Sequence, residues 1–143
     1  MTSYGTMFKL ILRHITDPSL AQWPEEDLFN ELYGWLSSAI AKLPQLQDEI
    51  SERDDFNLEN VNSSGFRNTL SETTREILAL SAAREWLRPQ INSTTLTLQS
   101  FSKKEGYSQK EHLTGLLNLD ESMKIELKKL MRDLSYIDDE YFD

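Results

Sequence analysis

The fold is decided by residues 71–89, whose sequence is SETTREILALSAAREWLRP. Ser71 is a favourable side-chain N-cap, and Thr73 with Glu76 three residues later offers a second way to start the same helix. The apolar run that follows covers several faces of a helix rather than one stripe, which is typical of a helix buried on more than one side. We therefore predict a central helix that ends at the Arg-Pro pair closing this segment.

Two helices are predicted before this segment. The first spans about residues 4–14, with Ser3 as its cap and an end before the Asp17-Pro18 pair. The second spans about residues 24–43, because a proline suits the first helical turn and three acidic residues follow it, where they complement the positive end of the helix dipole. Pro44 closes the second helix.

A fourth helix is predicted after the central one. Ser108 and Glu111 have the spacing of a capping box, and apolar residues then recur at helical intervals to about residue 134. Residues 118–122 contain Asn, Asp and Ser, and we expect a kink or break there. The segment Thr94–Leu98 is the only candidate for extended structure, and it is short.

The predicted fold is therefore all-α, a small bundle of about four main helices. A long middle loop occupies residues 45–70, with a short helix near 46–51 and a segment that we expect to order when a neighbour binds. We expect one helical domain at 1–135 and an extended, acidic and aromatic C-terminal arm at 136–143.

The composition limits the partners. The 143 residues carry a formal net charge of −9, which opposes non-specific binding of nucleic acid because that binding needs lysine and arginine against phosphates. Lysines do gather in the last third of the chain, but acidic residues alternate with them. There is no cysteine, which fits a reducing compartment, and we expect neither a membrane span nor a secretory signal.

No residue pattern predicts catalysis. His14 and His112 fall in different helices and lack the spacing of a metal site, so we interpret both as surface or interface residues. The acidic residues at 25–27 fit a helix N-terminus, and those at 138–140 lack the glycine and alternating oxygens of a calcium loop. We predict no catalytic residue, no metal and no cofactor, and therefore a protein that is not an enzyme.

Aromatic residues provide the interaction signals. Trp35 and Trp86 lie on apolar stripes and are predicted to pack in the core, whereas Trp23 lies outside any stripe and is a candidate interface anchor. Three aromatic residues in the acidic tail favour docking on another subunit, with folding back on the same bundle as the alternative. The predicted interface residues are Trp23, Tyr107, Gln109, His112, Tyr136, Tyr141 and Phe142.

Three blocks of the sequence resemble a known family. They are ILALSAAREWLRPQIN at 77–92, YSQ at 107–109 with His112-Leu113, and KLMRDLSY at 129–136. These blocks are similar to those of the head–tail connector, or head-completion, proteins of tailed bacteriophages, which are also called neck adaptors. The resemblance implies a helical virion subunit, made in the bacterial cytoplasm, that forms a homo-oligomeric ring below the portal protein.

Within that family the ring extends the DNA channel toward the tail, so the resemblance implies three partners: the portal, other copies of the chain, and the next neck or tail component. DNA would be passing cargo only. The alternatives are a tail-completion protein and a cytoplasmic helical regulator that binds a single partner protein. A small helical enzyme or nucleic-acid binder is a third hypothesis, without positive support from any motif.

Overall fold

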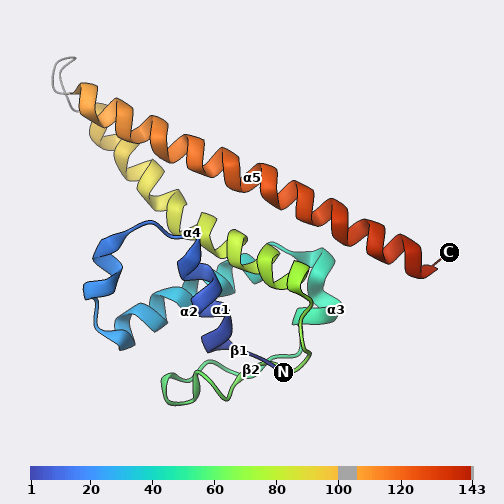
Figure 1. Ribbon diagram of the computed structural model, residues 1–143. Helices are drawn as coiled ribbons and strands as arrows, with labels where there is room; N and C mark the ends of the chain where they lie inside the picture. The colour runs from blue at the N-terminus through green and yellow to red at the C-terminus, as the bar shows by residue number, and fades with distance from the viewer. Residues whose placement is uncertain (100–105, 143) are drawn as a thin grey trace.

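Helix α4, Glu72–Gln99, is the central element of the molecule, and the other helices pack around it (Figure 1). The computed structural model describes the backbone of residues 1–99 and 106–142, and the side chains of residues 1–99 and 108–134. The other helices are α1 (Tyr4–Arg13), α2 (Glu25–Ala41), α3 (Gln47–Ile50) and α5 (Gly106–Phe142), with 3₁₀ turns at Pro18–Gln22, Pro44–Leu46 and Leu58–Asn60. The predicted all-α class is confirmed.

The predicted starts of α1, α2 and α4 are confirmed, and side chains cap two of the three. Ser3 Oγ accepts a hydrogen bond from the Thr6 N–H at 3.1 Å, and Ser71 Oγ accepts one from the Thr74 N–H at 3.2 Å. Helix α2 begins directly after Pro24, which makes no side-chain cap, so acidic residues in its first turn supply the favourable charge.

The interior is formed where α4 lies between α1 and α2 on one side and α5 on the other (Figure 1). Ile77, Leu78 and Ala82 face the larger apolar cluster, whereas Trp86 and Leu87 face a smaller one shared with α5. Full burial of each large apolar side chain contributes about 1.5–3 kcal/mol. The predicted burial of the central helix on several sides is confirmed.

A two-stranded sheet closes the end of the body that carries the N-terminus, and the sequence analysis missed it. Strand β1, Thr2–Ser3, pairs antiparallel with β2, Gly65–Phe66. A Cβ added at Gly65 would lie 2.2 Å from the Thr2 carbonyl oxygen, so only glycine permits this approach. Strands of two residues are too short to show the alternation by which strands are recognised in a sequence.

The middle segment is more ordered than predicted. The short helix expected near 46–51 is present as α3 and the turn before it. The rest packs on the body of the single chain, because Phe56 stacks on Tyr33 with ring centroids 4.5 Å apart and Phe66 is completely buried. The expectation that this loop awaits a neighbour is therefore wrong, because aromatic packing within the chain already holds it.

The predicted end of the central helix at Pro89 is wrong, as is the extended segment predicted at 94–98. Helix α4 continues through Pro89 to Gln99. A proline inside a helix costs about 3 kcal/mol, because it removes a hydrogen bond and crowds the preceding turn. Packing of Ile91 and Thr94 after the proline offsets this cost, and Thr95 Oγ1 donates to the Ile91 carbonyl at 2.8 Å.

Helix α5 also differs from the prediction at its start, at residues 118–122 and at its C-terminal end. It begins at Gly106, so Ser108 lies in its first turn rather than at the cap; a side-chain cap contributes only about 0.5–2 kcal/mol and does not fix a boundary. No break occurs at 118–122, since the Asp120 carboxylate accepts a hydrogen bond from Arg84 instead of capping the backbone.

The C-terminal arm is not extended. Helix α5 runs through residues 136–142 and crosses the predicted domain boundary at 135, because no glycine or proline follows residue 115 to interrupt it. The end of α4 and the start of α5 project together from the body (Figure 1). We call residues 89–99 and 106–119 the hairpin arm.

Candidate functional site

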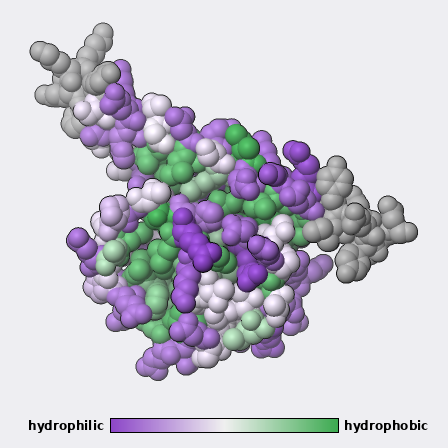
Figure 2. Space-filling model, in the orientation of Figure 1, coloured by the Kyte–Doolittle hydropathy of each residue, from purple (hydrophilic) through white to green (hydrophobic). Residues whose placement is uncertain are grey.

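A cleft lies where α2, α4 and α5 meet, at the base of the hairpin arm. Its charged lining residues are Lys42, Arg84, Glu85 and Arg88, and its apolar lining includes Leu43, Leu127 and Met131. Charged groups from α4 and from the C-terminal end of α2 therefore lie beside an apolar surface that α5 and the C-terminal end of α2 supply. Figure 2 shows hydrophilic and hydrophobic residues interspersed on the face of the molecule that is seen in Figure 1.

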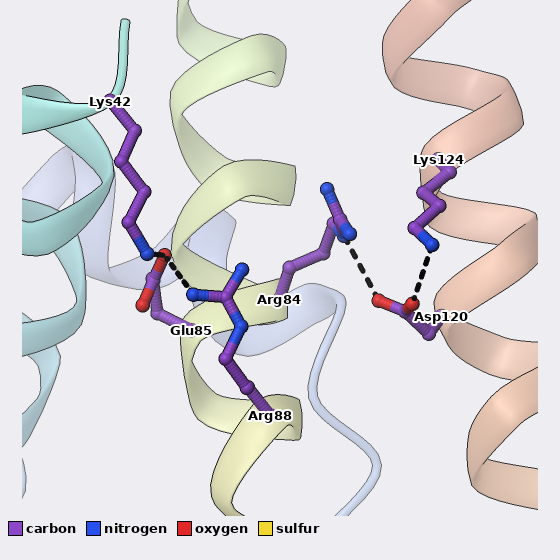
Figure 3. Close-up of polar contacts among 6 residues, drawn as sticks. All are labelled: Lys42, Arg84, Glu85, Arg88, Asp120 and Lys124. Carbon is purple, nitrogen blue, oxygen red and sulfur yellow. Dashed lines mark hydrogen bonds and ion pairs between the residues drawn. The ribbon is translucent and has the colours of Figure 1, made fainter. Parts of the chain in front are cut away.

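One carboxylate in the cleft serves two cations. Glu85 Oε1 lies 2.5 Å from Lys42 Nζ and 3.6 Å from Arg88 Nη1 (Figure 3). The Glu85 side chain is 14% exposed, whereas those of Lys42 and Arg88 are 52% and 50% exposed. Lysine has three N–H donors and arginine five, so both cations retain donors that face the solvent.

A second ion-pair group joins α4 to α5. Arg84 Nε donates to Asp120 Oδ1 at 3.0 Å, and Lys124 Nζ lies 3.4 Å from Asp120 Oδ2 (Figure 3). Burial by itself would raise the pKa of Asp120, but the hydrogen bond and positive charge of Arg84, together with Lys124, outweigh it and lower this pKa below its usual value. Asp120 is thus held as a carboxylate.

The cleft is a local positive region in an acidic protein. Of the charged residues that line it, Lys42, Arg84 and Arg88 are positive and Glu85 is negative, which leaves two positive charges in excess, whereas the whole chain has a net charge of −9. An apolar floor between such cations suits a ligand that carries both carboxylates and apolar groups. The arrangement fits binding of an acidic peptide.

The structure separates the predicted interface residues. Trp23 is 40% exposed and borders a shallow hollow at the start of α2 together with Pro24, Asp27 and Glu31. His112 borders a different hollow, on the hairpin arm beside Pro89.

Gln109 lies one turn before His112 on α5 and is partly buried. The side chains of four further predicted interface residues lie outside the described residues: Tyr107, Tyr136, Tyr141 and Phe142. The structure therefore does not unite the predicted residues into one site.

Two other predictions concern single side chains. Trp86 is buried and Trp35 packs against both apolar clusters, which confirms their role in the core. His14 lies at the C-terminal cap of α1, and its Nε2 is 3.2 Å from Glu76 Oε2, so this histidine links α1 to α4.

Two features are absent from the part of the chain that the structure describes. Over residues 1–99 and 106–142, no helix is long and apolar enough to cross a membrane. Among the described side chains, those of residues 1–99 and 108–134, no three histidine, cysteine or acidic groups lie closely enough together to hold a metal ion.

The cleft itself was not predicted from the sequence. Arg84, Glu85 and Arg88 interrupt the apolar run of α4 at spacings that place Arg84 and Arg88 on one face, and this was an available signal. Lys42 gave no such signal, because only the packing of α2 against α4 brings it to Glu85.

Comparison of the chain with family models, with curated proteins and with solved structures found no match. The class that the structure defines is therefore a structural one: a small helical bundle with a projecting two-helix arm and a cation-lined cleft at the base of that arm.

Proposed function

We propose that this chain is a structural virion protein, a head–tail adaptor that forms a ring below the portal and extends the DNA channel toward the tail. The observation that carries the proposal is the hairpin arm, which projects from the body as two packed helices (Figure 1). The resemblance of residues 77–136 to phage neck adaptors gives this shape its specific interpretation.

The arm has the surface of an assembly element. Leu96 near the end of α4 is 67% exposed, and Leu117 on α5 is 48% exposed. Where such apolar groups adjoin in a larger patch, they mark surfaces that another subunit covers. A ring requires two different faces on each subunit, and the arm and the cleft are two such faces.

The charge of the chain supports the same role. A channel through which DNA slides must not grip phosphates, and fixed cations along its wall would do so. A net charge of −9 fits a subunit that borders passing DNA without binding it.

Mass spectrometry of purified particles of the encoding phage tests this proposal. We expect the chain in tailed particles, at a copy number comparable to that of the portal protein and far below that of the major capsid protein. Its absence from the particles, with abundant chain in the lysate bound to one host or phage protein, would overturn the proposal in favour of a cytoplasmic regulator.

A further inference from the structure

The cleft at the base of the hairpin arm places cationic and apolar groups side by side, where one ligand could contact both. Lys42 and Arg88 are half exposed and share the single carboxylate of Glu85, so their remaining N–H donors are open to a further acceptor. Beside them, Leu127 and Met131 of α5 supply apolar surface. A ligand that satisfies both parts must carry carboxylates next to large apolar side chains.

Carboxylates and aromatic rings occur together in one segment of this chain. Residues 136–143 read YIDDEYFD, with four acidic residues, three aromatic residues and one isoleucine. Carboxylates form the strong, charge-assisted hydrogen bonds that lysine and arginine donate, and arginine also stacks favourably on aromatic rings. The charge of this segment is therefore complementary to that of the cleft.

Within one molecule, residues 136–142 of α5 extend away from the cleft of that same molecule. Met131 lines the cleft, and α5 continues from it without interruption to Phe142. At 1.5 Å per residue, the end of this helix lies about 16 Å beyond Met131. Figure 1 shows the end of α5 projecting past the body on the side opposite the hairpin arm.

We propose that the cleft of one subunit binds the C-terminal segment, residues 136–143, of a second copy of the chain. Lys42 and Arg88 receive the carboxylates, and the apolar floor receives the aromatic side chains. Because the two contacting surfaces differ, the contact is head-to-tail, and its repetition generates a ring when the rotation closes. The inference rests on the proposed function and names its subunit contact.

A labelled synthetic peptide with the sequence of residues 136–143 tests the contact when it is titrated with the full-length chain and followed by fluorescence anisotropy. We expect saturable binding that weakens at least about tenfold, or about 1.4 kcal/mol, in the double variant Lys42→Ala/Arg88→Ala. The matched control is Lys9→Ala/Lys110→Ala, which removes two exposed lysines outside the cleft lining and should leave binding unchanged.

A second experiment exchanges the charges of the cleft and of the peptide, and it tests the contact even if the alanine substitutions disturb the fold. The variant Lys42→Glu/Arg88→Glu should reject the natural peptide and bind a peptide with Asp138→Lys, Asp139→Lys and Glu140→Lys. Circular dichroism verifies that each variant is helical. Equal binding of the natural peptide to the wild-type and alanine variants, or displacement of it by short duplex DNA at physiological salt, would overturn the inference.

The two proposals fail in different ways. A chain that is found in phage particles but does not bind the peptide retains the adaptor function and loses the head-to-tail contact. A chain that binds the peptide and is absent from particles retains the contact as a self-association site and loses the adaptor function.

Discussion

The body and the hairpin arm of this protein are stabilised in different ways. In the body, α1, α2, the middle segment and α4 converge on one large apolar cluster, and aromatic rings of Tyr4, Phe8 and Phe56 contact one another within it. In the arm, the described side chains include only two that are buried, Thr94 and Leu116. The comparison shows that buried apolar packing holds the body together, whereas most described side chains of the arm are partly or fully exposed.

The largest expected change in the free energy of unfolding comes from truncating a leucine to alanine, and we compare one such change in each region. Leu78→Ala empties a completely buried position in the body and should lower the free energy of unfolding by about 3–5 kcal/mol. Leu116→Ala removes the same atoms from the arm, where solvent is close, and should cost about 1–2 kcal/mol. Urea unfolding followed by circular dichroism measures both. Equal costs would contradict the contrast between the regions.

A change at Pro89 should strengthen the arm. Pro89→Ala restores the missing backbone N–H inside α4 and removes the crowding of the turn before it, with an expected gain of about 1–3 kcal/mol. Amide hydrogen exchange of residues 90–99 should slow, while exchange in α1 changes little. A loss of stability would mean that the proline supports a bend that the arm requires.

Tyr4 tests how the body holds its middle segment. Its hydroxyl donates to the Asp54 carbonyl, so Tyr4→Phe should cost about 1–2 kcal/mol by leaving that carbonyl unpaired. Burial, with the nearby Tyr33, raises the pKa of Tyr4 from 10.0 to about 12. Between pH 10 and 12 the unfolded chain releases this proton and the folded chain keeps it, so the stability of the wild type should fall there.

The Tyr4→Phe variant supplies the control for that pH dependence. Its free energy of unfolding should lack the part of the alkaline decline that belongs to Tyr4. Parallel declines in the two proteins over pH 10–12 would show that the residue is not held protonated by the body.

The smallest effect is expected at the junction of body and arm. The pKa of Asp120 is lowered in the folded chain, so its contribution is present above the ordinary value of 3.8 and is lost as the pH falls through the folded value. Asp120→Asn should cost a few tenths to about 1 kcal/mol at pH 7, since the partners are partly exposed. When the free energy of unfolding is measured at decreasing pH, the difference between variant and wild type should shrink below pH 4.

The sequence predicted local features well and tertiary ones poorly. Ser3, Pro24 and Ser71 mark helix starts by chemistry that acts within one turn, and the apolar run after Ser71 indicates burial by its own periodicity. Continuation through Pro89 was not predictable in this way, because the packing that offsets the proline comes from α5, beyond the end of α4.

The same limit explains the incomplete prediction of the site. Exposed aromatic residues were chosen for their type, and Trp23 is indeed exposed, but the cleft depends on Lys42 and Glu85, which are 43 residues apart. Charged residues on a helix normally face solvent, so three of them within the central helix did not predict a cleft until α2 and α5 were placed beside it.

Light scattering of the purified chain, alone and mixed with the portal protein, tests the adaptor role most directly. We expect the chain to join the portal in one complex whose mass corresponds to a full ring of copies. We also expect Lys42→Glu/Arg88→Glu to reduce the number of copies bound, whereas Lys9→Glu should not. A chain that remains a monomer at high concentration and does not bind the portal would contradict the adaptor role.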